Sequence, residues 1–179
     1  GVRITTEEAD KDAAVVEIST MVANRSRKKE KLIVTVKFED EEHQVYEDRV
    51  HLTSFAESQN TVHQKIAIEK PKLWNCETPH LYRCTIQIYA GEELLDEQEL
   101  SYGIRKITLD ALRGLRINGE TVKLRGTCIH HDHGILGAAA YEAAEMRKCR
   151  LLKEAGFNSV RSAHHPAGKA FLDACDKTG

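Results

Sequence analysis

The architecture of this protein follows from residues 122–179, VKLRGTCIHHDHGILGAAAYEAAEMRKCRLLKEAGFNSVRSAHHPAGKAFLDACDKTG. The run 122–129 is short, mostly apolar and rich in strand formers, so it predicts a strand. In 141–155 apolar residues recur at three-residue steps and a glycine follows, which predicts a capped helix. A second strand is predicted over 157–161 and a second helix over 169–177. Strand, helix, strand and helix in this order predict a parallel sheet.

Residues 1–106 follow a different pattern, because apolar and polar residues alternate in four stretches. A period of two predicts antiparallel strands with one face against a core. Turn-forming residues separate the stretches at 24–26, 39–42 and 90–92. The alternating apolar residues are Val16, Ile18, Val22, Leu32, Val34, Val36, Phe38, Val62, Ile66, Ile68, Tyr82, Cys84, Ile86 and Ile88. Short strands at this spacing predict a sandwich of the immunoglobulin type, although the Cys…Trp…Cys pattern of antibody domains is absent.

The chain therefore divides into a mainly β, immunoglobulin-like sandwich at 1–106 and a truncated α/β segment at 107–179. One strand–helix–strand–helix unit cannot cover both faces of its strands, so we expect the chain to stop inside a larger α/β domain. Two parallel strands also leave an open edge. We therefore expect the 107–179 part to pair with another copy, to be swapped, or to be loosely ordered, and a homo-oligomer is one expected outcome.

The composition is that of an ordinary globular protein, with 41% hydrophobic residues, 30% charged residues and a net charge of −2. Lys and Arg form no single field, which argues against a nucleic-acid partner. Their densest run, 25–31, is interpreted as a solvated hairpin turn. No apolar stretch approaches the ~20 residues that cross a bilayer, so no membrane partner is expected. The chain begins at Gly1 without a leader, and its five scattered cysteines predict free thiols and a cytoplasmic location.

Two polar clusters directly follow the two predicted parallel strands. The first is 130–134, His-His-Asp-His-Gly, and the second is 161–166, Arg-Ser-Ala-His-His-Pro. In a barrel of alternating strands and helices, the loops at the carboxyl ends of the strands build the active site. Titratable residues in these loops are therefore candidates for function.

Three interpretations of the first cluster compete. A metal site is disfavoured, because adjacent side chains in an extended loop diverge and the spacing matches no zinc motif. A hydrogen-bonding cluster under the rim of the sheet is the structural alternative. Sugar binding is favoured, because a carboxylate can accept hydrogen bonds from two hydroxyls while flanking histidines donate. No metal and no cofactor is expected.

The motif order in residues 70–179 resembles that of family 2 glycoside hydrolases, which include β-galactosidases and β-glucuronidases. The matching segments are Pro-Lys-Leu-Trp at 71–74, Pro-His-Leu-Tyr at 79–82, Tyr-Gly-Ile-Arg-Lys at 102–106, Leu-Arg-Ile-Asn-Gly at 115–119, Lys-Leu-Arg-Gly at 123–126 and Asn-Ser-Val-Arg-Ser-Ala-His-His-Pro at 158–166. Residues 1–69 match only in strand pattern. The resemblance implies that 107–179 is the start of a TIM barrel.

Four site residues are implied by this resemblance. His130 and Asp132 would contact sugar hydroxyls, Arg161 would orient the nucleophile carboxylate and favour its ionised form, and His164 would hydrogen-bond the sugar or the developing charge. The substrate partner would be a β-glycoside, most readily a β-galactoside. Ala163 and His165 depart from the residues common at those positions, which leaves the exact sugar open.

The catalytic carboxyl groups are expected outside this chain. Retaining glycosidases need two carboxyl groups about 5 Å apart. The family places an Asn-Glu pair after the fourth barrel strand and another Glu after the seventh, whereas this chain contains no Asn-Glu. The acids of its barrel part are expected on solvated helix faces: Glu142, Glu145, Glu154, Asp173 and Asp176. We therefore expect the parent protein to be an enzyme and this chain alone to be inactive.

Two rival functions remain. A non-catalytic carbohydrate-binding or adhesion module would use the sandwich, and an exposed aromatic platform would favour it. Aromatic content is only 6%, and the single tryptophan, Trp74, is interpreted as a core or corner residue. A metal-dependent hydrolase would instead use the cluster from His130 to His133.

Overall fold

The computed structural model describes residues 1–130 and 132–179, and they form two compact units. The first unit comprises Gly1–Leu73 and Leu81–Lys106, and the second comprises Trp74–His80 and Ile107–Gly179. The change after Lys106 coincides with the change of period in the sequence. The short segment 74–80 belongs to the second unit although it lies between two strands of the first, which the sequence did not predict.

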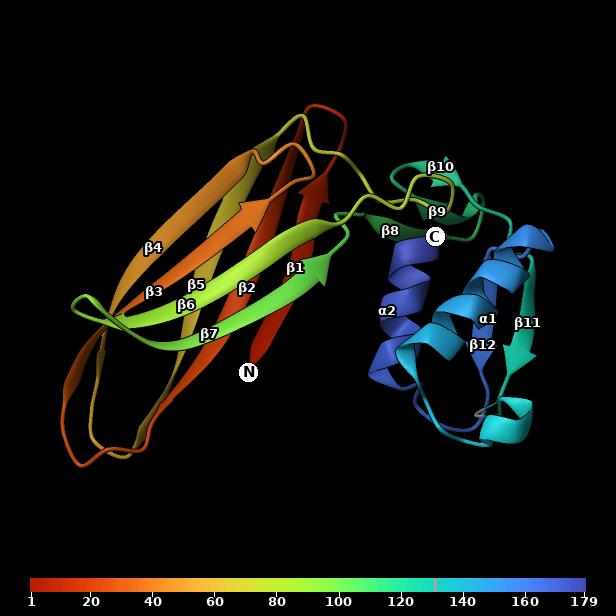
Figure 1. The fold of residues 1–179 in the computed structure, drawn as a ribbon. Coiled ribbons are helices and arrows are strands. Elements are labelled where there is room, and N and C mark those ends of the chain that lie inside the picture. The colour runs from red at the N-terminus through yellow and green to blue at the C-terminus, as the bar shows by residue number, and fades with distance from the viewer. Residues whose placement is uncertain (131) are drawn as a thin grey trace. The chain divides into compact units, whose positions relative to one another are not determined.

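The first unit is a sandwich of two antiparallel sheets (Figure 1). Its strands are β1 (Val2–Ala9), β2 (Ala13–Asn24), β3 (Glu30–Glu39), β4 (Val45–Ser54), β5 (Ser58–Glu69), β6 (Tyr82–Ala90) and β7 (Glu93–Tyr102). One sheet has the order β1-β2-β5 and the other β4-β3-β6-β7. The immunoglobulin-like fold predicted for this part is confirmed.

The strands that were predicted from the sequence are those that contribute most to the core of the sandwich. β2, β3, β5 and β6 alternate between buried and exposed residues, and they contain all four predicted apolar sets. Phe38, Ile18 and Ile68 are fully buried between the sheets. The strands β1, β4 and β7 were missed because they bury almost no residue completely, which weakens the period-two signal, whereas β5 was predicted although it also lies at a sheet edge.

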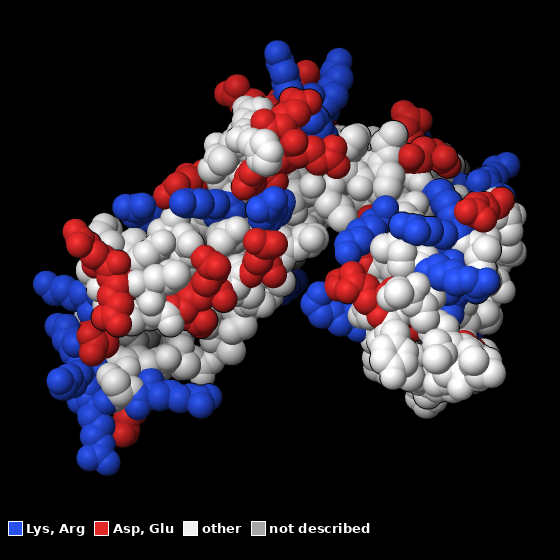
Figure 2. All heavy atoms as spheres, in the orientation of Figure 1, with Lys and Arg blue, Asp and Glu red and all other residues white. Residues whose placement is uncertain are grey.

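The basic run lies in the connection between β2 and β3 and at the start of β3. Because β2 and β3 belong to different sheets, this connection is not the hairpin turn that the sequence predicted, although the run is solvated as expected. All five of its Lys and Arg side chains are exposed: Arg25, Arg27, Lys28, Lys29 and Lys31. Figure 2 shows blue atoms gathered at the lower left end of the sandwich, where the connection between β2 and β3 lies in Figure 1.

The second unit contains the predicted strand–helix–strand–helix order, preceded by a small antiparallel sheet. That sheet consists of β8 (Ile107–Asp110), β9 (Gly114–Ile117) and β10 (Glu120–Thr121). The α/β part consists of β11 (Gly126–Ile129), the 3-10 helix η1 (Gly134–Leu136), α1 (Glu142–Glu154), β12 (Ser159–Ser162) and α2 (Lys169–Thr178). β11 and β12 are parallel, as the sequence predicted.

Two glycines have clear structural reasons. Gly126 lies opposite Ser159, and a Cβ there would be 2.5 Å from Ser159 Oγ and 3.0 Å from its carbonyl oxygen, so only glycine lets the two strands approach. Gly156 ends the first helix with φ at +88°, a left-handed conformation that favours glycine, and its N–H donates to the Lys153 carbonyl at 2.9 Å.

The segment 74–80 is held in the second unit by main-chain carbonyls and long side chains. Trp74 is buried, and its Nε1 donates to the Asp176 carbonyl at 2.7 Å. Asn118 Nδ2 donates to the Trp74 carbonyl at 2.9 Å, and Lys153 Nζ donates to the Cys76 carbonyl. Trp74 is therefore a buried residue of the second unit, held there by hydrogen bonds of its side chain and its carbonyl.

The helices of the second unit pack through a small apolar core. Cys149, Phe171 and Ala174 are buried there, with Ile129 and Val160 of the two parallel strands packed against them. The Sγ atoms of Cys149 and Cys175 lie 3.8 Å apart, and all five cysteines are free thiols. Of the helices in the described part of the chain, none has the length and apolar character that spanning a bilayer requires.

Candidate functional site

The two polar clusters meet at one edge of the parallel pair. Ile129, at the end of β11, is in register with Ser162, at the end of β12. The Ala163 N–H donates to the Ile129 carbonyl at 3.0 Å and extends this pairing by one step. The loops that begin at His130 and Ala163 therefore leave the sheet side by side, at the strands' carboxyl ends.

His130 and His164 are brought into direct contact by this arrangement. Their ring centroids lie 5.4 Å apart with an angle of 36° between the rings. His164 has φ at +64°, a left-handed conformation that is uncommon outside glycine and is often found at functional positions. The turn that carries His164 is closed by Ser162 Oγ, which donates to the His165 carbonyl at 2.8 Å.

Arg161 precedes Ser162 in β12 and lies in register with Cys128 of β11. Because Ile129 and Val160 pack against the helices, their neighbours Cys128 and Arg161 point to the opposite face of the sheet. Arg161 is exposed, and its Nη1 lies 3.9 Å from Cys128 Sγ. The guanidinium thus occupies the face that a barrel would enclose.

Asp132 is exposed on the loop that His130 begins. His131, between them, lies outside the described residues. The structure therefore brings three predicted residues, His130, Arg161 and His164, to adjoining positions, and it puts the carboxylate of Asp132 at the solvent side of the same loop. All four side chains are exposed at the same end of the strand pair, where a ligand's hydroxyl groups could reach them.

One predicted surface acid, Glu145, is in fact buried. It lies in the first turn of α1 and is 5% exposed, because it faces the same side of the helix as Cys149 and points into the root of the loop. His133 Nε2 donates to Glu145 Oε1 at 2.9 Å, and Lys148 Nζ lies 3.1 Å from Oε2 in an ion pair. The expectation of a solvated face was wrong for Glu145.

The pKa of Glu145 reflects these contacts. Burial alone would raise the pKa of this carboxyl, but the hydrogen bond from His133 and the Lys148 ammonium outweigh it and lower the pKa below its ordinary value. The sequence did contain a signal for this burial. Glu145, Cys149 and Leu152 fall at i, i+4 and i+7, which is the spacing of one helix face.

The metal hypothesis finds no arranged donor set in the part of the chain that the structure describes. No group of three or more His, Cys, Asp or Glu side chains is placed to hold an ion among residues 1–130 and 132–179. His131, which belonged to the proposed cluster, lies outside this part. His133 instead directs its Nε2 at Glu145.

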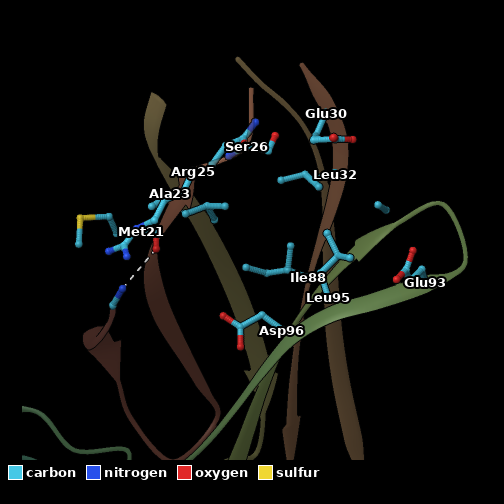
Figure 3. Close-up of a pocket in the computed structure, with 14 residues that line it drawn as sticks. Met21, Ala23, Arg25, Ser26, Glu30, Leu32, Ile88, Glu93, Leu95 and Asp96 are labelled. Atoms are coloured by element: carbon cyan, nitrogen blue, oxygen red, sulfur yellow. Dashed lines mark hydrogen bonds between the residues drawn. The ribbon is translucent and has the colours of Figure 1, made fainter. Parts of the chain in front are cut away.

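A separate cleft of about 660 Å³ opens at one end of the sandwich (Figure 3). Its lining residues come from Gly1, β2, the connection between β2 and β3, and the strands β3, β6 and β7. They include the apolar Leu32, Ile88 and Leu95 and the acids Glu93 and Asp96. No residue lining this cleft is aromatic. A cleft without aromatic faces offers nothing for a sugar ring to stack on, so it does not strengthen the carbohydrate-binding alternative for the sandwich.

A sandwich followed by parallel strands and helices, with polar loops at the strands' carboxyl ends, is the arrangement expected at the start of a barrel, the class of fold whose active sites lie in those loops. The chain belongs to family 2 of the glycosyl hydrolases: the family matches residues 1–105, and the TIM barrel domain of the same family matches residues 110–179. The predicted family and fold are thereby confirmed.

Relatives support this membership over the whole chain. A β-galactosidase of Bacteroides ovatus is 35% identical over 180 residues, covering 100% of this chain and 21% of the relative. A β-glucuronidase of Bacteroides fragilis is 32% identical over 115 residues, covering 64% of this chain and 16% of the relative. The chain thus spans about a fifth of these proteins.

Solved structures of similar proteins have the same fold along the whole chain. A family 2 member from Bacteroides cellulosilyticus superposes with a TM-score of 0.96 at 36% identity, covering 100% of this chain and 25% of that one. The β-glucuronidase of Bacteroides uniformis gives a TM-score of 0.91 at 29% identity, covering 100% of this chain and 22% of that one.

Proposed function

We propose that the whole protein is a retaining glycoside hydrolase acting on β-galactosides, and that this chain supplies the residues that hold the sugar. The observation that carries the proposal is the common edge of β11 and β12, where the His130 and His164 rings lie 5.4 Å apart. The β-galactosidase of Bacteroides ovatus, similar along the entire chain, supports the choice of sugar.

Each residue has a role that its chemistry supports. The Asp132 carboxylate accepts hydrogen bonds from two sugar hydroxyls, and the His130 and His164 rings donate to others. The Arg161 guanidinium faces the enclosed side of the sheet, where a positive charge favours the ionised form of a nearby nucleophile carboxylate. Binding and charge stabilisation are thus the tasks of this chain.

Bond cleavage needs groups that we assign to the remainder of the protein. A retaining mechanism requires two carboxyl groups about 5 Å apart, one as nucleophile and one as acid and base. The chain has no Asn-Glu pair, and Glu145 is committed to His133 and Lys148. We therefore expect this chain alone to hydrolyse no glycoside.

The proposal is tested by kinetics of the whole protein on an aryl β-galactoside and an aryl β-glucuronide. We expect a higher kcat/KM for the galactoside and a loss of about 100-fold on Asp132→Ala, the size that losing a charged hydrogen bond produces. Glu154→Gln, an exposed acid on α1, is the control and leaves kcat/KM unchanged. A preference for the glucuronide would overturn the choice of sugar, and turnover by the 179-residue chain alone would overturn the division of labour.

The role of Arg161 has its own test. Removing the guanidinium in Arg161→Gln raises the pKa of the nucleophile carboxylate, since a neighbouring positive charge lowers such a pKa by about 1 unit or more. The acidic limb of the kcat/KM profile against pH then moves to higher pH. An acidic limb at the wild-type position would separate Arg161 from the nucleophile.

Location and assembly remain part of this proposal. Five free thiols suit a reducing compartment, and we propose a cytoplasmic protein. Alkylation after acid quenching and denaturation of the cells is expected to label all five cysteines, because denaturation opens the buried Cys84 and Cys149 to the reagent. Self-association of the 107–179 part is likewise proposed, and sedimentation of the chain against its 20.2 kDa monomer mass tests it.

A further inference from the structure

A buried polar chain links the loop of Asp132 to the core of the second unit. Lys148 Nζ lies 5.6 Å from the centroid of the buried Phe171 ring, and the same ammonium pairs with Glu145 at 3.1 Å. Glu145 in turn accepts from His133 at 2.9 Å. His133 directly follows Asp132 in the sequence, so this series of contacts ends next to a residue that is proposed to bind the sugar.

The burial of this chain is unusual for its residue types. The side chains of His133, Glu145 and Lys148 are 10%, 7% and 19% exposed. Acids and lysines are rarely buried unless paired, because the loss of hydration must be offset by contacts. An exposed residue at position 145 would keep its hydration and avoid this cost. The buried pairing of Glu145 with His133 and Lys148 therefore indicates that Glu145 serves to position its partners.

His133 is also the anchor of the loop's main chain. Its N–H donates to the Gly137 carbonyl at 2.9 Å, and its carbonyl accepts from the Leu136 N–H at 3.2 Å. These bonds close η1 into a tight turn on His133. The side chain of His133 is fixed to α1, and its main chain closes the turn. Together these contacts determine where the loop leaves the sheet.

We infer that Glu145 is a positioning residue for the sugar-binding loop, acting through His133 to hold Asp132 and His130 at the end of β11. This inference rests on the proposed function, in which Asp132 and His130 bind the sugar. Glu145 touches no substrate in this account. A binding group must be held to within about 0.5 Å, and a misplacement of about 1 Å costs roughly 100-fold.

The first test measures the hold on the loop directly. In the whole protein, Glu145→Gln keeps the size of the side chain and removes its charge, whereas Glu154→Gln makes the same change at an exposed position of the same helix. Hydrogen exchange in Glu145→Gln should become about tenfold faster or more at the Leu136 and Gly137 amides and stay unchanged in the last turns of α1. Equal exchange in both variants would overturn the inference.

The second test asks whether the effect passes through Asp132. With an aryl β-galactoside, Glu145→Gln should raise KM about tenfold with a smaller change in kcat, because binding is lost in ground and transition states alike. In an Asp132→Ala background the same substitution should raise KM by a clearly smaller factor, because only the placement of His130 remains to be lost. An effect of full size in that background would show that Glu145 acts elsewhere and would overturn the inference.

The two tests separate this inference from the proposed function. Hydrolysis of neither glycoside by the wild type would overturn the function, while the exchange rates would still decide whether Glu145 holds the loop. Normal hydrolysis with unchanged KM and exchange in Glu145→Gln would leave the function standing and remove Glu145 from it. His133→Ala should reproduce the faster exchange, since it cuts the same hydrogen bond from the other side.

Discussion

The sandwich and the barrel start are stabilised in different ways. The sandwich buries a continuous apolar core between its sheets, with Val16, Val34, Val36 and Phe38 fully inaccessible. In the described part of the second unit, the apolar core centres on only Cys149, Phe171 and Ala174. Buried polar contacts supplement it there, at Trp74 and Glu145 among others. The comparison teaches that the sandwich relies on one large apolar core, whereas the second unit supplements a small apolar core with buried hydrogen bonds and a buried ion pair.

The strongest way to break this comparison is to empty the sandwich core. Phe38→Ala removes a fully buried ring that lies 6.3 Å from the Tyr82 ring and 6.2 Å from the Tyr102 ring. The free energy of unfolding of the Phe38→Ala variant should be about 3–5 kcal/mol lower than that of the wild type, as measured by urea denaturation followed by circular dichroism. Phe55→Ala, at a ring that is 61% exposed, should change it by less than about 0.5 kcal/mol. Equal losses in both variants would contradict an apolar core centred on β3.

The second effect concerns the buried carboxylate of the second unit. Glu145→Gln should lower the free energy of unfolding at pH 7 by about 1.5–3 kcal/mol, the range for a hydrogen bond to a charged group. The lowered pKa of Glu145 means that the carboxylate stabilises the fold above the ordinary carboxyl pKa, and that this contribution is lost as pH falls through the lowered value.

The wild type should therefore exceed Glu145→Gln in stability at neutral pH, and the gap should close below the ordinary pKa of 4.5. Fluorescence of the single tryptophan follows this unit, because Trp74 belongs to it. A gap that widens in acid would mean that folding raises the pKa of Glu145 and does not lower it.

The third effect concerns the close approach of β11 and β12 at Gly126. Gly126→Ala places a methyl group 2.5 Å from Ser159 Oγ and should cost about 1–3 kcal/mol, because β11 must move away from β12. Gly168→Ala is the matched control, since its added Cβ would meet only Ala140 at an ordinary 3.7 Å. Thermal unfolding of both variants measures the difference, and a tolerated Gly126→Ala would show that the strand pair is not tightly packed there.

The smallest effect is expected for one hydrogen bond of the inserted segment. Trp74→Phe keeps an aromatic ring but removes the Nε1 donor to the Asp176 carbonyl, so stability of the second unit should fall by about 0.5–1.5 kcal/mol. Helical circular dichroism during urea denaturation follows this loss, and the strand signal of the sandwich should keep its midpoint. A shift of the sandwich midpoint alone would contradict the assignment of 74–80 to the second unit.

Much of the fold could be predicted from the sequence where burial imposes a period. Strands with a fully buried face, such as β3 and β5, and both helices were predicted to within a few residues. The edge strands β1 and β7 were not, because their partial exposure leaves little alternation. The place of segment 74–80 could not be predicted either, since it depends on long-range bonds such as that from Trp74 to Asp176.

The candidate site shows the same division. The two loops could be predicted to meet, because parallel strands end at a common edge, and the ring contact of His130 with His164 agrees with that. The partner of His133 could not be predicted, because an acid in the first turn of a helix is ordinarily solvated and also favoured by the helix dipole. Only the alignment of Glu145 with Cys149 on one helix face indicated otherwise.

The most direct measurement of the central claim is a crystal structure of the whole protein with an unreactive β-galactoside analogue. The account predicts sugar hydroxyls within hydrogen-bonding distance of Asp132 and His130, with the His164 ring alongside. A sugar bound instead in the cleft between β2 and β7, with the edge of β11 and β12 free of it, would contradict the account.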